Sequence, residues 1–180
     1  MDGSDAVDVF ADTHQIGHFE FATDQRIWLL DTVTRKVWPC FRQREEDDCV
    51  GHEFWTRDGL VFFDNRRKGH DGTITSDRTQ AVTAEVHSDD PNQTPYVGFA
   101  DKKGNLVKKI DLPYYCNHYH ANNDNSMLVG DEVDDLVLID LKNQPSMPQI
   151  LCHHGTSWAW QYTHCHPTWG WNSKKILFAS

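Results

Sequence analysis

The sequence has few basic residues and no long apolar run. Its 180 residues include 17 Lys and Arg against 27 Asp and Glu, which gives a formal net charge of −10. This surplus of negative charge repels polyanions at long range, so we expect no nucleic-acid partner and no anionic membrane partner. Because of the same negative charge, an anionic substrate would need a local positive centre. No apolar run approaches the roughly 18 residues that are needed to cross a bilayer.

Targeting signals and a disulfide pattern are also missing. The first residues, MDGSDAVDVFADTHQ, contain neither a basic start nor an apolar core, and residues 1–13 are expected to form a flexible tail. The cysteines are odd in number and include no CxxC pair, which favours reduced thiols. Together these features predict a cytoplasmic protein. The cysteines are Cys40, Cys49, Cys116, Cys152 and Cys165.

Several common catalytic motifs do not occur in the chain. There is no GxGxxG dinucleotide loop, no Walker phosphate loop and no GxSxG nucleophile turn. The segment HEFW at His52 begins like the HExxH zinc motif but lacks its second histidine. The seven tryptophans admit a sugar-stacking role, but large aromatic side chains dominate sheet cores, so we assign them to packing between sheets.

Short apolar or alternating runs bounded by turn residues recur along the chain, and no segment has the period of an amphipathic helix. Three stretches, TRDGLVFF, DKKGNLVK and WNSKKILF, each place a polar turn before a β-rich run, as hairpins do. The pattern predicts an all-β fold.

A looser repeat accompanies these runs, because a histidine opens several of them. These histidines are His18, His52, His118 and His166. The separations between them are irregular but centred near the length of one β-propeller blade. At that blade length the whole chain corresponds to about four blades. We therefore expect a single domain over residues 1–180 that is built from β-propeller blades. Equivalent strands of neighbouring blades line the central channel, so the histidines should converge there.

The segment QYTHCHP contains three side chains able to bind a metal, namely Gln161, His164 and His166. In an extended strand the two histidines point to one face and Cys165 to the other, and Gln161 reaches the histidine side only if the backbone bends. All three could then share one cation. The alternative is that the histidines are surface or core residues satisfied by hydrogen bonds. Convergence with the histidines of other units favours the metal site.

Four segments in this order, GHEFWTRDG, CNHYHANND, LCHHGTSW and QYTHCHP, resemble the oligogalacturonate lyases. The resemblance runs from about His14 to the C-terminus. It implies the fold of that family, a seven-bladed propeller. This chain resembles the second half of the family's chain, and some segments inside the match are absent. The expected fold is thus an open arc of about four blades, whose exposed edges invite self-association.

The resemblance also implies a set of site residues. The family's manganese ion is held by three histidines and a glutamine, which correspond here to His118, Gln161, His164 and His166. This mixed nitrogen and oxygen donor set suits Mn²⁺ or another divalent first-row metal, and the lack of cysteine ligands argues against structural zinc. His120 is a competing candidate for the position of His118.

Two further residues receive roles from the resemblance. The proposed general base of the family corresponds to His52, and an arginine thought to contact substrate corresponds to Arg26. His154, in LCHHGTSW, is expected near the site without an assigned role.

The activity implied by the resemblance is cleavage of short galacturonate oligomers, especially digalacturonate, by metal-assisted β-elimination in pectin degradation. A cation beside the uronate carboxylate stabilises an enolate-like transition state, and a neutral histidine can accept the C5 proton. Two alternatives stay open. One is an inactive propeller fragment that keeps its ligands, and the other is a metal-dependent hydrolase that uses the HxH pair with Glu53 as base.

Overall fold

The structure is a computed structural model that describes residues 26–43, 48, 50–65, 94–113, 115–145, 147–158 and 163–180. The predicted tail, the unit at His18, Cys49 and the candidate ligand Gln161 lie outside these residues. Within them the chain forms strands, turns and irregular segments but no helix, so the all-β prediction is confirmed. No helix in this part of the chain is therefore long and apolar enough to cross a membrane.

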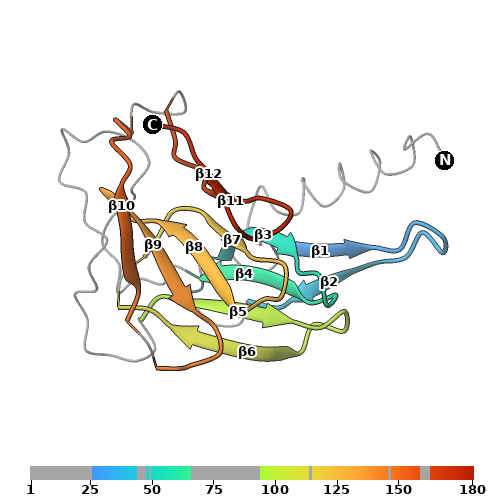
Figure 1. Cartoon of the computed structure of the whole chain (residues 1–180). Coiled ribbons are helices and arrows are strands. Elements are labelled where there is room, and N and C mark those ends of the chain that lie inside the picture. The colour runs from blue at the N-terminus through green and yellow to red at the C-terminus, as the bar shows by residue number, and fades with distance from the viewer. Residues whose placement is uncertain are drawn as a thin grey trace.

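Two four-stranded antiparallel sheets form the centre of the molecule (Figure 1). In each sheet the strands pair in chain order, and neighbouring strands are joined as in the blade of a propeller. The first sheet contains β3 (Val50–Trp55), β4 (Val61–Asn65), β5 (Tyr96–Ala100) and β6 (Leu106–Asp111). The second contains β7 (Tyr119–Ala121), β8 (Met127–Asp131), β9 (Asp135–Asp140) and β10 (Gln149–His153).

Two shorter antiparallel hairpins flank these sheets (Figure 1). One is made of β1 (Ile27–Leu30) and β2 (Val37–Phe41), and the other of β11 (Thr168–Trp169) and β12 (Ile176–Leu177). The four sheets agree with the expected arc of about four blades, two of them with four strands among the described residues. Each predicted hairpin turn is present, at Thr56–Leu60, Asp101–Asn105 and Gly170–Lys175.

The β5–β6 turn shows how neighbouring sheets fit together. Gly104 has a φ of 86°, and a Cβ there would lie 2.3 Å from the carbonyl oxygen of Cys40 in β2. A glycine is thus needed both for the positive φ and for the close approach of the two sheets. The indole N–H of Trp38 donates a hydrogen bond to the carbonyl oxygen of Lys102 in the same turn, at 2.8 Å.

The two middle strands of the β3–β6 sheet, β4 and β5, are buried on both faces, and successive side chains of each strand face opposite clusters. On β4, Phe62 packs toward the β7–β10 sheet, whereas Val61 and Phe63 pack toward β1 and β2. On β5, Val97 and Tyr96 divide between the two clusters in the same way. A sheet with apolar residues on both faces must lie between two others, as an internal propeller blade does.

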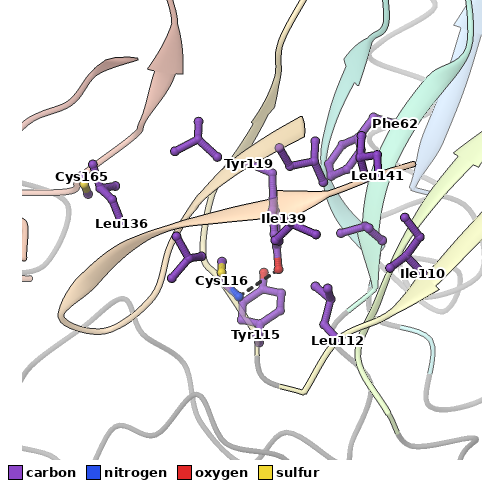
Figure 2. Close-up of a cluster of buried hydrophobic side chains, with 14 of the residues drawn as sticks. Phe62, Ile110, Leu112, Tyr115, Cys116, Tyr119, Leu136, Ile139, Leu141 and Cys165 are labelled. Atoms are coloured by element: carbon purple, nitrogen blue, oxygen red, sulfur yellow. Dashed lines mark hydrogen bonds between the residues drawn. The ribbon is translucent and has the colours of Figure 1, made fainter. Parts of the chain in front are cut away.

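The larger core cluster lies between the two four-stranded sheets (Figure 2). Phe62 is fully buried, and its ring lies 4.3 Å from that of Phe54 and 5.7 Å from that of Tyr119. Truncation of such a phenylalanine to alanine typically costs about 3–5 kcal/mol of unfolding free energy. The hydroxyl of Tyr119 in turn accepts a hydrogen bond from the backbone N–H of Cys116, at 2.9 Å. This contact fixes the segment that leads into β7.

The tryptophans do not all pack in the core as predicted. Trp158 is 1% exposed and its indole N–H donates to the carbonyl oxygen of Val133, so it has the expected packing role. Trp55 and Trp171 are 54% and 97% exposed. Both lie at the turn ends of hairpins, where no neighbouring described sheet covers them.

Candidate metal centre

Three histidines from two neighbouring sheets meet at one point. His118 directly precedes β7, and His164 and His166 lie in the segment that leads into β11, which packs beside β7. One ligand atom from each imidazole lies within 4.8 Å of the others. The ring centroids of His118 and His166 are 3.7 Å apart, and that of His164 lies 5.5 Å from that of His118. The convergence expected from the histidine-led units is therefore present in the structure.

The backbone around His164 and His166 differs from the expected strand. Residues 163–167 are irregular, and β11 begins only at Thr168. His166 has a φ of 44°, in the left-handed region that non-glycine residues rarely occupy. The two rings still lie on one side, 5.4 Å apart, whereas Cys165 is buried in the core. A bent backbone, not strand alternation, separates the histidines from the cysteine.

His118 is held by a buried carboxylate. Its Nδ1 lies 2.7 Å from Oδ2 of Asp131, and its backbone N–H donates to Oδ1 of the same side chain. Asp131 ends β8 and is fully buried. A neutral imidazole that donates its Nδ1 proton to this carboxylate has the lone pair of Nε2 available for a metal. The pairing therefore fixes both the orientation and the tautomer that metal binding requires.

His52 has the same kind of partner in the neighbouring sheet. Its Nδ1 lies 3.0 Å from Oδ2 of Asp64, a residue of β4 that is 1% exposed. The hydroxyl of Tyr115 donates to the same Oδ2 at 2.6 Å and lies 3.3 Å from His52 Nδ1. The ring of His52 is 5.1 Å from that of His118. An oriented imidazole thus stands directly beside the three-histidine cluster.

Local distortion of β3 turns His52 into this position. The pairing of β3 with β4 shifts register between Gly51 and Phe54, which marks a β-bulge, and His52 has a φ of 46°. Bulges often re-aim a side chain next to a functional site. A Cβ at Gly51 would lie 3.2 Å from Oδ1 of Asp64, so the absence of a side chain there leaves room for the carboxylate.

The surroundings shift the pKa values of two of these histidines in opposite directions. Burial acts to lower the pKa of His52, but the hydrogen bond to Asp64 and the charge of that carboxylate outweigh it, so the pKa is raised. Burial lowers the pKa of His166, and the neighbouring imidazoles of His118 and His164 lower it further. A lowered pKa favours the neutral form, which is the form that binds metals.

Arg26 lies at the start of β1 on the His52 side of this cluster. Its Nε is 3.8 Å from Oε2 of Glu53, and both side chains are about half exposed. Its backbone N–H donates to Oε1 of Gln43 at 3.2 Å. The charge of Arg26 also acts on the pKa of His52, where it opposes protonation. The predicted substrate arginine is thus near the predicted base, and Glu53 is its ion-pair partner.

The structure separates the other two histidine candidates from the metal cluster. His120 accepts a hydrogen bond from the backbone N–H of Trp169 at Nδ1, at 3.0 Å, and it does not belong to the three-histidine group. His154 is buried, with Nε2 2.9 Å from the carbonyl oxygen of Glu132 and Nδ1 accepting from the N–H of Thr156. Both ring nitrogens of His154 are therefore engaged in hydrogen bonds within the protein.

Sequence reasoning missed the two aspartates and Tyr115. A signal for the aspartates was available, because two histidine-led units each have an aspartate at or next to the end of their second strand, in HEFWTRDGLVFFD and HYHANNDNSMLVGD. Antiparallel pairing of the first two strands of a unit brings such a residue back beside the histidine. Tyr115 comes from the connection between two sheets and has no comparable pattern.

The donor set fits a divalent first-row metal. Imidazoles are typical ligands of manganese, iron or zinc sites, and here the ligand atoms of three lie within 4.8 Å of one another. His118 also has the buried carboxylate partner that is usual for such ligands. The candidate amide ligand Gln161 lies outside the described residues.

Comparison with known proteins supports this view of the fold. No protein-family model matches the chain. Its fold is that of part of a β-propeller, because two solved propeller structures superpose on 86% of the chain with TM-scores of 0.60 and 0.59. The first is an oligogalacturonate lyase in complex with manganese, at 24% identity, and the second an oligogalacturonate lyase from Vibrio parahaemolyticus, at 23%.

Among curated proteins, the oligogalacturonide lyase of Pectobacterium atrosepticum is 24% identical over 180 residues, which covers 87% of this chain. The resemblance to oligogalacturonate lyases that four short segments indicated is thus confirmed in sequence and in fold. The chain spans about 40% of the length of this relative and 38% of each of the two solved structures.

Proposed function

We propose that this protein is an oligogalacturonate lyase-like enzyme that cleaves short galacturonate oligomers by metal-assisted β-elimination. The observation that carries the proposal is the position of His52, an imidazole oriented by Asp64, with its ring 5.1 Å from that of the ligand candidate His118. A base and a cation site side by side are what removal of a proton next to a carboxylate requires. The similarity to oligogalacturonate lyases supports the same substrate class.

The metal would be held by His118, His164 and His166, with Gln161 as the fourth protein ligand. A divalent cation there would supply positive charge beside the substrate carboxylate, where charge develops in the transition state. Manganese is favoured because one similar lyase structure contains it.

The protein's own groups would carry the proton and position the substrate. With Nδ1 turned to Asp64, His52 would accept the C5 proton at Nε2, and the buried carboxylate would stabilise the imidazolium that forms. The C5–H electrons then form the C4–C5 double bond as the C4–O bond breaks and the glycosidic oxygen leaves. Arg26 would bind a uronate carboxylate, for which a guanidinium offers two parallel N–H donors.

The expected cytoplasmic location remains part of the proposal. Four cysteines in the described part of the chain carry free thiols, which fits a reducing compartment. Three of them, Cys40, Cys116 and Cys165, are buried. Burial raises the pKa of the Cys165 thiol to about 12, so this residue has no tendency to act as a thiolate beside the histidines.

The purified chain with digalacturonate and Mn²⁺ provides the test. We expect ultraviolet absorbance from a conjugated double bond, lost on addition of a chelator and in His52→Ala. The matched control is His153→Ala, an exposed histidine on β10 whose loss should leave the rate unchanged. Metal binding without any product would indicate an inactive fragment, and new reducing ends without conjugation would indicate a hydrolase with Glu53 as base. Either result would refute the lyase proposal.

A further inference from the structure

A second pocket lies at the other end of the strands that lead from the metal centre. His118 directly precedes β7, His166 precedes β11, and His52 lies in the first half of β3, at its bulge. The ends of the same strands, with the hairpin turns that follow, line an open cavity of about 970 Å³. Its described lining residues include none of the three clustered histidines. The two sites therefore adjoin along the same strands, but the described lining of the pocket contains no side chain of the three-histidine cluster.

Side-chain hydrogen bonds between three sheets give this pocket a defined shape. The amide of Asn125 donates to Oδ1 of Asp58 at 2.8 Å, which joins the β7–β8 turn to the β3–β4 turn. The backbone N–H of Asn123 donates to the hydroxyl of Ser173 at 2.9 Å, and its side-chain amide donates to the carbonyl oxygen of Trp171. Each turn is thus fixed to its neighbour, and the pocket exists before any ligand binds.

The pocket offers aromatic surface to water. Trp171 is 97% exposed and Trp55 is 54% exposed, and the rings of Phe54 and Trp169 line the floor. Exposed aromatic side chains gathered in a concave site are typical of ligand-binding surfaces, because burying them against a ligand is favourable. The apolar C–H face of a sugar ring is a suitable partner for such rings.

Several of the polar groups that line the pocket can donate hydrogen bonds. Because Nδ1 of His120 accepts from the backbone N–H of Trp169, the neutral ring carries its proton on Nε2. The indole N–H of Trp169 is buried and has no acceptor among the described residues. Arg57 and Lys175 add two cationic groups to the lining.

A ligand that matches this lining must present acceptors, negative charge and an apolar ring face. Asp58 is not one of the residues that line the pocket, and its Oδ1 accepts hydrogen bonds from Asn125 and Thr56. From these observations we propose that the pocket is a second binding site for an acidic saccharide, a uronate residue whose carboxylate and hydroxyl oxygens accept from these donors. The choice of a uronate rests on the proposed function, whereas the pocket itself does not.

Calorimetric titration of the metal-free protein tests this site. With a chelator present, we expect digalacturonate to bind and the neutral sugar galactose to bind at least tenfold more weakly. Lys175→Met should weaken digalacturonate binding about fivefold or more, whereas Lys174→Met, which removes the adjacent exposed lysine outside the pocket, should change it less than twofold. Trp169→Phe keeps an aromatic ring at this position but removes the indole N–H, and it should weaken binding as well.

The outcomes separate this proposal from the lyase proposal. Binding that survives His164→Ala belongs to the pocket, whatever the catalytic activity of the chain. Binding that disappears in His164→Ala, that is equal for the two lysine variants, or that is absent at millimolar sugar would overturn the pocket proposal, and lyase activity could still be present.

Discussion

Replacement of Asp131 by asparagine should weaken metal binding through the tautomer of His118. Asp131 uses both carboxylate oxygens, one for the His118 backbone N–H and the other for Nδ1 of the ring. Asparagine has one oxygen. If that oxygen keeps the backbone N–H, the amide NH₂ faces Nδ1 and donates to it, so the neutral ring carries its proton on Nε2. The lone pair that the metal needs is then blocked.

The magnitude follows from the behaviour of similar partners in other metal sites. Loss of an outer hydrogen-bond partner typically lowers metal affinity by about 10- to 100-fold, which corresponds to roughly 1.4–2.8 kcal/mol. We expect the upper half of this range for Asp131→Asn, because the carboxylate is fully buried and no water competes for its place. Titration calorimetry with Mn²⁺, at a pH where the histidines are neutral, measures the change directly.

Asp64→Asn is the matched control. It makes the same chemical change in the neighbouring sheet, but its histidine, His52, stands outside the metal cluster. We expect the affinity for Mn²⁺ to change less than about threefold and the turnover of digalacturonate to fall. Thermal unfolding must show that both variants fold. An Asp131→Asn protein that folds like the parent and binds Mn²⁺ equally well would refute the orientation argument.

Three further predictions follow from the same site. His164→Ala should abolish stoichiometric Mn²⁺ binding by elemental analysis, while His153→Ala retains it. Arg26→Lys should lower kcat/KM for digalacturonate about tenfold, because lysine lacks the paired donors; an unchanged value would assign Arg26 to the surface. NMR titration of the metal-free protein should place the pKa of His52 above its ordinary value of about 6.5, and Asp64→Asn should lower it. The interaction with Asp64 then stabilises the fold fully below about pH 6.5, and this contribution is lost as pH rises through the folded-state pKa.

Much of the fold was readable from the sequence because it depends on local patterns. The turn residues of TRDG and DKKG specify hairpins, and the structure has them at Thr56–Leu60 and Asp101–Asn105. The runs VFF and YVGFA place apolar or small side chains on both faces, and they lie in the strands β4 and β5, which are buried between two other sheets. The convergence of His118 with His164 and His166 followed from the repeat, because repeated units place equivalent residues around one axis.

The parts of the site that sequence did not predict depend on distortions and on cross-strand register. His52 is aimed by a bulge and His166 by a left-handed residue, and neither has a sequence signature as strong as a turn glycine. The predicted strand geometry for the HxH segment was wrong for this reason, although both rings reach the same side. The exposure of Trp171 was missed because composition alone favours packing.

One local scaffold yields different chemistry in successive sheets. In the units that begin at His52 and His118, the histidine contacts an aspartate in the second strand, and both aspartates are buried. What differs is the surroundings, since His52 adjoins the hydroxyl of Tyr115, whereas His118 adjoins two further imidazoles.

The unit that begins at His166 departs from this scheme. Its second strand is followed by Ala179, whose backbone N–H donates to the carbonyl oxygen of Cys165, much as that of Asp131 donates to His118. Alanine offers no carboxylate, so His166 has no buried aspartate at the corresponding place, and it is the most exposed of the three clustered histidines. Its position is instead imposed by its left-handed backbone and by the neighbouring rings, which lower its pKa. A cation bound between the imidazoles would offset the unfavourable effect of bringing them together. Metal binding therefore explains the strained backbone of His166, whereas packing in the core would not.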